Sequence, residues 1–167
     1  MKVLYKRIVG RLSSKEAKTA YQEASVPACK FVDLYRGQYL NWEAFDTFPL
    51  PAVLFEYRIN LKDKTVTITL HVCYEQPQDT SSISKTMDNA LKYFDFIEVT
   101  NGLIDELESE VNGKLELIDE EMVKDDAIVN VHLLTYTGQY IGRNKEKFKY
   151  TTGEDIDMDP GIKHQFD

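Results

Sequence analysis

FPLPAVLFEYRIN-LKDK-TVTITLHVCY, residues 48–74, contains the clearest structural signal in the chain. Apolar and polar side chains alternate strictly over residues 65–74, and a period of two is typical of a half-buried strand. The preceding run is rich in β-forming residues and has prolines only at its entrance, where a missing N–H does least damage to a sheet. Residues 61–64 are short, polar and suited to a tight turn. The stretch therefore predicts a β-hairpin.

The two faces of this hairpin differ in character. We expect the apolar face to seal a core, and the other face, with Glu56 and Arg58 beside the threonines, to meet water or another subunit. The apolar face consists of Val53, Phe55, Tyr57, Ile59, Val66, Ile68, Leu70 and Val72.

Before the hairpin, residues 2–24 predict either two short helices or one bent helix, with a restart at Ser13 or Ser14. Residues 28–35 predict a strand, and residues 38–49 an ordered loop that carries Trp42 and Phe45 as core lids or interface anchors. The apolar side of the helical region consists of Val3, Leu4, Ile8, Leu12, Ala17 and Tyr21.

After the hairpin, a polar loop over residues 75–82 leads into a predicted helix capped by Thr80, Ser81 or Ser82. We expect this helix to cover the sheet and to extend as far as Asn112-Gly113. Strands are predicted over residues 114–123 and 128–136. The apolar stripe assigned to the helix consists of Met87, Ala90, Leu91, Phe94 and Ile97, continued by Leu103, Ile104, Leu107 and Val111.

This order of elements predicts an α+β fold. We expect a mainly antiparallel sheet of about 4–5 strands with a central β-hairpin, covered on one face by helices. Residues 1–140 are predicted to form a single domain. Residues 141–167 lose all periodicity and are predicted to be an extended arm or a partly disordered tail.

Composition restricts the class of protein. With 167 residues, 43% of them hydrophobic and 11% aromatic, the chain suits one domain and is not generally disordered. No run approaches the ~18 consecutive apolar residues of a membrane helix, and the positive N-terminus lacks the apolar core of a signal peptide. Cys29 and Cys73 have no metal-site or redox-motif spacing, so we expect reduced, buried thiols in a cytoplasmic protein.

The formal net charge of −8 is concentrated in residues 101–130, which contain ten acids against two lysines. This distribution disfavours duplex-DNA binding through a broad basic face. The acidic segment is either a solvated helix end and loop or a negative surface that repels nucleic acid or docks a basic partner. Its candidate residues are Asp105, Glu106, Glu108, Glu110, Glu120 and Glu121.

Motifs for catalysis are missing from the sequence. It contains no glycine-rich phosphate loop, no GxSxG and no HExxH, and His71, His132 and His164 are interpreted as structural or surface histidines. Asp33 with Glu56-Tyr57-Arg58 weakly resembles the carboxylates of a metal nuclease, but arginine replaces the usual lysine and cannot serve as a base. We therefore predict no catalytic residue, no metal and no cofactor.

Several runs together resemble a known family. VDLYRGQ (32–38), FPLPAVLFEY (48–57), TVTITLHV (65–72), ALKYFDFIEVTNGL (90–103) and DDAIVNVHLLTYTGQY (125–140) resemble small proteins from the tail modules of tailed phages and prophages. They look like the tail terminators, also called tail-completion or minor tail proteins. The resemblance covers about residues 28–140, and its strongest marks are PLPAV at 49–53 and Asp125-Asp126.

The resemblance implies a structural protein rather than an enzyme. Tail terminators form a ring, typically a hexamer, on the end of the tail tube. The ring stops tube growth and joins the tail to the head. The implied partners are further copies of the chain, the tail tube protein and the head–tail connector protein, without specific nucleic-acid binding. The implied locations are the cytoplasm of the bacterial host during assembly and the virion tail, and the acidic segment would suit a lumen through which DNA slides.

The end of the chain suggests an intersubunit contact. A basic patch over residues 143–149 precedes an acidic stretch over residues 154–160, with apolar residues spaced along both. We expect this arm to lie across a neighbouring subunit or tail component, and the alternative is an arm folded on its own domain or disordered. The candidate interface residues are Trp42, Phe45, Tyr140, Arg143, Lys145, Lys147, Phe148, Lys149 and Tyr150.

Two other functions remain open at the level of sequence. The first is a small, soluble, monomeric adaptor or binding module of the same fold without a phage role. The second is the metal-dependent nuclease-like enzyme suggested by Asp33 and Glu56. The size of the particle in solution separates the ring from the adaptor.

Overall fold

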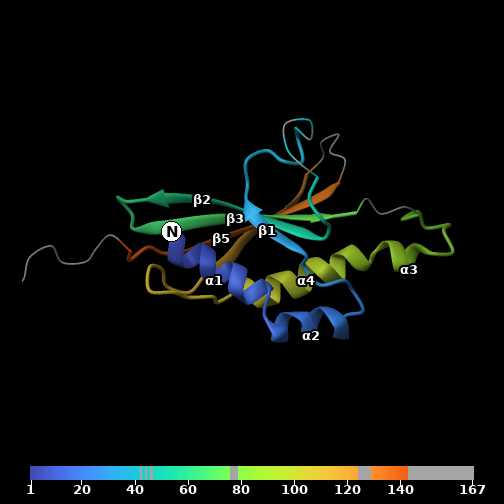
Figure 1. Ribbon diagram of the computed structural model, residues 1–167, viewed down its shortest axis with the longest axis horizontal. Helices are drawn as coiled ribbons and strands as arrows, with labels where there is room; N and C mark the ends of the chain where they lie inside the picture. The colour runs from blue at the N-terminus through green and yellow to red at the C-terminus, as the bar shows by residue number, and fades with distance from the viewer. Residues whose placement is uncertain (42, 44, 46, 76–78, 124–128, 143–167) are drawn as a thin grey trace, which may run out of the picture.

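The computed structural model describes residues 1–41, 43, 45, 47–75, 79–123 and 129–142. These residues form an α+β fold in which helices pack on one face of a mostly antiparallel sheet (Figure 1), as the sequence predicts. The helices are α1 (Lys2–Leu12), α2 (Lys15–Glu23), α3 (Met87–Ala90) and α4 (Lys92–Ile104). The strands are β1 (Phe31–Leu34), β2 (Ala52–Asn60), β3 (Thr65–Tyr74), β4 (Glu116–Met122) and β5 (Asn130–Gln139).

The predicted hairpin is confirmed as β2 and β3. They pair antiparallel from Ala52 opposite Cys73 to Asn60 opposite Thr65. The Asn60 side chain closes the turn, because its Oδ1 accepts hydrogen bonds from the backbone N–H groups of Lys62 and Asp63 at 3.0 and 3.2 Å. An asparagine that bonds to the backbone ahead of it is a standard way to start a turn.

The sheet has the strand order β1-β2-β3-β5-β4. β1 runs parallel to β2, and the other neighbouring pairs are antiparallel. β1 is short, so its pairing with β2 ends where Leu34 lies opposite Phe55. The remainder of β2 therefore forms an edge of the sheet, and β4 forms the opposite edge.

The N-terminal region forms two helices, in agreement with one of the two predicted alternatives. The Ser14 hydroxyl caps α2 by accepting a hydrogen bond from the Ala17 N–H at 3.0 Å. Leu4, Ile8 and Leu12 recur every four residues and are buried against the sheet and α4. Val3, which the sequence placed on the same side, is 42% exposed.

The helix after the hairpin differs from its prediction. It begins at Met87 rather than near residue 80, breaks at Leu91 and ends at Ile104 rather than at Asn112-Gly113. The break shifts the helical phase, so Phe94 from the predicted stripe is 43% exposed. The buried residues of α4 are Tyr93, Phe96, Ile97, Thr100, Leu103 and Ile104.

The main core lies between the helices and the sheet. Side-chain hydrogen bonds within it connect α2 to α4 and α4 to β5. Tyr21 of α2 stacks on Phe96 of α4 with ring centroids 4.9 Å apart, and its hydroxyl lies 2.9 Å from the Thr100 hydroxyl. The Tyr136 hydroxyl of β5 donates to Asn101 Oδ1 at 2.8 Å. These partners allow large tyrosines to be buried without leaving a polar group unsatisfied.

Candidate interaction surface

The sheet face that turns away from the helices, here called the open face, has two unlike halves. At one end the register sets Ala52 opposite Cys73, and Cys73 opposite Val131, so apolar side chains line three strands. We call this end the covered half. At the other end β3 and β5 present threonines, namely Thr65, Thr67, Thr69, Thr135 and Thr137, and we call this end the threonine half.

The covered half is a second, smaller core. Ala52, Leu54 and Cys73 are fully buried there, beneath Tyr39 from the segment between β1 and β2. That segment rises above the sheet on the side opposite the helices (Figure 1). The expectation that this face meets water or another subunit is therefore wrong for the covered half, because a segment distant in sequence from β3 folds over it. Apolar residues at positions 52, 54 and 73 of the polar face were the available sequence signal.

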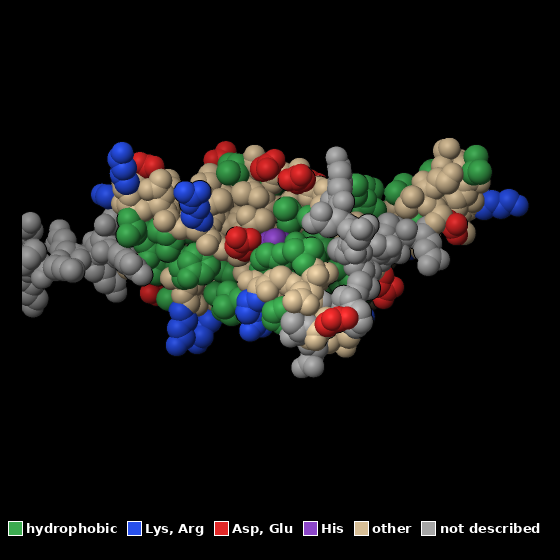
Figure 2. All heavy atoms as spheres, turned by 90° about the horizontal axis from the view of Figure 1, so that it is seen from above, with side chains coloured by type: hydrophobic (Ala, Val, Ile, Leu, Met, Phe, Trp, Pro, Cys, Tyr) green, Lys and Arg blue, Asp and Glu red, His purple; other side chains and the backbone are tan. Residues whose placement is uncertain are grey.

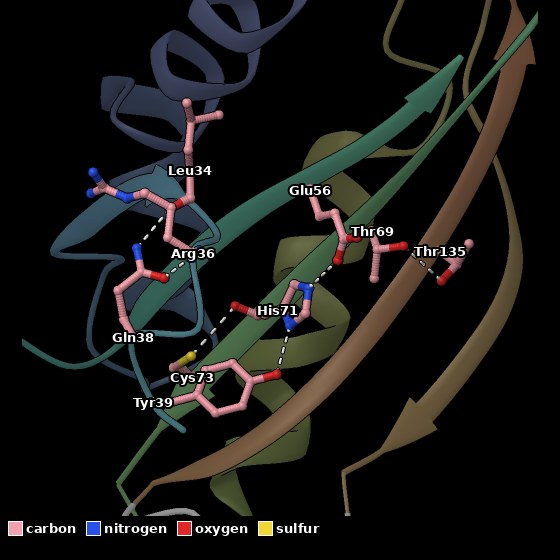
Figure 3. Close-up of polar contacts among 9 residues, drawn as sticks. All are labelled: Leu34, Arg36, Gln38, Tyr39, Glu56, Thr69, His71, Cys73 and Thr135. Carbon is pink, nitrogen blue, oxygen red and sulfur yellow. Dashed lines mark hydrogen bonds and ion pairs between the residues drawn. The ribbon is translucent and has the colours of Figure 1, made fainter. Parts of the chain in front are cut away.

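His71 lies at the boundary between the two halves and is tied to both (Figure 3). Its ring Nδ1 lies 2.8 Å from the Tyr39 hydroxyl, and its Nε2 lies 3.2 Å from Glu56 Oε2. The Tyr35 ring stacks on the imidazole with centroids 3.8 Å apart. Burial lowers the pKa of His71, and the neighbouring carboxylate of Glu56 opposes that shift. His71 therefore attaches the segment between β1 and β2 to the sheet as a neutral, buried imidazole.

The turn that positions the Tyr35 and Tyr39 rings is stabilised by hydrogen bonds from its own side chains. Gln38 Nε2 donates to the Leu34 carbonyl, and Gln38 Oε1 accepts from the Arg36 N–H, both at 2.6 Å (Figure 3). Gly37 lies between them with a φ of 85°, a conformation that glycine adopts at little cost. Sequence reasoning gave Tyr35, Gln38 and Tyr39 no role. Tyr35 and Tyr39 contact His71, which lies on a strand distant in sequence, whereas Gln38 bonds within its own turn.

Glu56, His71 and Tyr39 are connected by consecutive hydrogen bonds, an arrangement that could relay a proton. The burial of His71 and Tyr39 favours a structural role instead. Tyr39 is 6% exposed, so the inner end of the series offers little access to a substrate. Burial also raises the pKa of Cys73 to about 12, which keeps this neighbouring thiol protonated and unreactive at neutral pH. The Cys73 thiol donates to the backbone carbonyl of His71 at 3.6 Å, on the same strand.

The carboxylates that suggested a nuclease are each paired separately. Asp33 forms an ion pair with Arg36 at 2.6 Å, and Glu56 bonds to His71. Among the residues that the structure describes, no group of three His, Cys, Asp or Glu side chains is arranged to hold a metal ion.

The threonine half is an open surface bordered by charge. The hydroxyls of Thr69 and Thr135 lie 3.4 Å apart across β3 and β5 (Figure 3). Glu56 and Arg58 of β2 border the threonines on one side, and acids of β4 border them on the other. Figure 2 looks onto this face and shows Asp and Glu side chains gathered along one long edge. The threonine half is therefore a polar surface whose hydroxyl groups lie between charged borders.

The predicted acidic residues are exposed and fall into two groups. Glu120 and Glu121 lie on β4, whereas the others lie between α4 and β4. Glu120 turns toward the helix side and bonds His132 Nε2 at 2.8 Å, and Glu121 lies on the open face opposite Leu133. The group between α4 and β4 consists of Asp105, Glu106, Glu108 and Glu110, of which Glu106 pairs with Lys114 at 3.0 Å.

The structure describes some of the predicted interface residues. Phe45 is half-buried, with the Arg36 guanidinium carbon 5.9 Å from its ring centroid. Tyr140 is 6% exposed and belongs to the main core, so it is not a free anchor. Trp42, Arg143, Lys145, Lys147, Phe148, Lys149, Tyr150 and His164 lie outside the described residues, as do Asp125 and Asp126.

A second exposed region lies at the hairpin end of the molecule. Tyr57 was predicted to be in the core but is 47% exposed, and Leu61 in the turn is 58% exposed. Both line an open groove of about 460 Å³. The remaining lining residues are Met1, Ile59, Tyr140 and Gly142. Tyr57 is exposed because the hairpin projects past the helix layer (Figure 1), which the alternation of the strand cannot reveal.

Neither the described helices nor a comparison with known proteins indicates a particular function. None of these helices combines the length and apolar character needed to cross a membrane. No protein-family model matches the chain, and no curated protein matches it.

Proposed function

We propose that this protein is a structural subunit of phage tail assembly, similar to tail terminators. In this proposal, copies of the chain form a ring at the end of the tail tube, typically a hexamer. The ring stops tube growth and presents a surface to the head–tail connector. The partners are other copies of the chain, the tail tube protein and the connector protein, and the place of action is the host cytoplasm during assembly and then the virion tail.

The observation that carries the proposal is the exposed hairpin end together with the threonine half of the sheet. A ring requires a heterologous contact, in which one patch of each copy meets a different patch of the next. The edge of β2 beyond Phe55, with Tyr57 and Leu61 exposed beside it, supplies one such patch. The threonine half with its acidic border supplies a polar patch of different character.

The acidic residues between α4 and β4 and along β4 support the same proposal. A lumen that DNA crosses without binding needs a negative wall, because cations would retain the phosphates. Glu108 and Glu110 are exposed, with no ion pair to a described residue. We place these acids toward the lumen.

The test is the mass of the purified full chain by light scattering, combined with negative-stain electron microscopy. Six copies of the 19.3 kDa chain give about 116 kDa for a closed ring. The expected result is a ring-shaped particle near this mass, either alone or when purified tail tubes are added. A 19.3 kDa species that neither forms rings nor caps added tubes would contradict the proposal and favour the monomeric adaptor.

A further inference from the structure

The backbone of β2 is free to accept another strand beyond the end of β1. The carbonyls of Pro51 and Phe55 accept hydrogen bonds from Lys30 and Tyr35 at 2.9 Å, so the odd-numbered residues of this region turn their backbone groups toward β1. By the same alternation, the N–H and C=O groups of Tyr57 and Ile59 face the sheet edge. No described residue bonds them there. An edge of this kind is a template for strand addition.

The side chains at this edge divide by face. Tyr57 and Ile59 point toward the groove on the helix side, and the side chains of Met1 and Leu61 also line it. Arg58 points to the opposite face and is exposed. A strand that fits this edge therefore has apolar residues at alternate positions and acids between them.

The hairpin end is also basic. Lys62 and Lys64 in the turn are exposed, as is Lys2 at the start of α1. Figure 2 shows Lys and Arg side chains at this end, close to hydrophobic ones. The edge therefore favours an acidic strand over a basic one.

One segment of this chain has the required pattern. Residues 154–159 read EDIDMD, so Ile156 and Met158 alternate with acids. In an extended conformation these two apolar side chains lie on one face and Asp155, Asp157 and Asp159 on the other. The first set matches the groove and the second matches Arg58.

We propose that the β2 edge and its groove bind residues 154–159 of a second copy of this chain as an added strand. This inference rests on the proposed ring and supplies its intersubunit contact. Each copy then offers an edge to one neighbour and an acidic segment to the other, which is the heterologous arrangement that closes a ring.

Charge favours binding between copies over binding within one chain. The chain leaves the described domain beside its own hairpin, because the Tyr140 N–H donates to the Lys64 carbonyl at 2.7 Å and Gly142 lines the groove. The residues that follow directly are basic, with Arg143, Lys145, Lys147 and Lys149 against one acid. Repulsion between these residues and the lysines of the hairpin would disfavour the return of residues 154–159 to the edge of their own chain.

The test uses two variants of the full chain, Leu61→Cys and Met158→Cys, mixed and treated with a short bismaleimide. Leu61 is exposed at the groove, so its substitution leaves the core intact. The expected product is a covalent dimer that forms only in the mixture. Ile83→Cys is the matched control, because Ile83 is 90% exposed in the segment preceding α3, at the other end of the molecule from the hairpin (Figure 1). Its mixture with Met158→Cys should give no dimer above the level of the parent chain.

Charge reversal sharpens the result. Arg58→Glu with Lys62→Glu should lower the dimer yield several-fold, and adding Asp155→Lys and Asp157→Lys should restore it. Particles that form without the Leu61–Met158 link would overturn this inference while leaving the proposed function standing. A third variant carries Leu61→Cys and Met158→Cys in one chain. If it forms only an intramolecular link and the mixture of single variants forms no dimer, the exchange between copies is overturned. A chain that assembles neither alone nor on tail tubes would contradict the proposed function itself.

Discussion

The two faces of this sheet are held by different means, although the same strands supply both. On the helix side, side chains from α1, α2 and α4 form one continuous core that includes Phe55, Ile68 and Leu134. On the open face, a smaller cluster around Leu54 and Cys73 is covered by the segment between β1 and β2, and the rest of the face is polar. The larger core therefore lies on the helix side, while the threonine half of the open face and the hairpin end remain exposed.

The largest expected effect is on the helix side. Phe55→Ala should reduce the free energy of unfolding by about 3–5 kcal/mol, because it leaves a cavity beneath the hairpin at a residue that is 1% exposed. Urea denaturation followed by circular dichroism measures this loss. Thr67→Ala, on the opposite face of the same hairpin, is the control and should change stability by less than about 0.5 kcal/mol. Equal effects of the two substitutions would break the comparison.

The second core should contribute less than the first. Leu54→Ala removes a fully buried side chain, so we expect a loss toward the lower end of the ~2–5 kcal/mol range. The reason is that the segment above it is a single layer, which can settle into part of the cavity. The same urea titration measures it. A loss below about 1 kcal/mol would mean that the covered half is loosely packed and that this segment is readily displaced.

The pH dependence of stability should reveal the contribution of His71, which lies at the boundary between the covered half and the threonine half. The pKa of His71 is lowered from its ordinary value of 6.5, so below pH 6.5 the unfolded chain binds a proton more readily than the folded chain. Stability should therefore fall as the pH drops below about 6.5, until the lowered pKa is passed. His71→Gln should remove this contribution to the slope in unfolding titrations between pH 7 and pH 5. An unchanged slope would mean that His71 is not the group responsible.

The smallest expected effect is at Glu56, whose side chain is 56% exposed. Glu56→Gln should cost less than about 1 kcal/mol, because an exposed partner of this kind is well screened by solvent. The same variant tests the nuclease alternative. We expect the parent protein to leave duplex and single-stranded DNA intact in magnesium or manganese. Cleavage that disappears in Glu56→Gln would replace the structural role with an enzymatic one.

Sequence patterns predicted those helices and strands that are defined by neighbouring residues, such as an alternation or a helix cap. The alternation over residues 65–74 predicted β3, and Ser13 or Ser14 was predicted to start the second helix, which Ser14 caps. The strands after residue 114 were also located by pattern, although β5 begins later and extends further than expected. In each case the periodicity that defines the element is the periodicity that buries it.

Features that depend on distant segments could not be predicted. The buried face of α4 differs from the predicted one because the helix is interrupted at Leu91, where neither glycine nor proline marks a boundary. The covered half required knowledge of where Tyr39 lies relative to Leu54 and Cys73. The exposure of Tyr57 depends on how far the helix layer extends below the hairpin, which no property of β2 alone determines.

The most direct test of the account is amide hydrogen exchange on the full chain at low and high protein concentration. If copies associate through the β2 edge, the amides of Tyr57 and Ile59 should exchange markedly more slowly once particles form. The amide of Ile68, inside the sheet on β3, should not change with concentration. Particles that form while Tyr57 and Ile59 exchange at an unchanged rate would contradict the assignment of association to this edge.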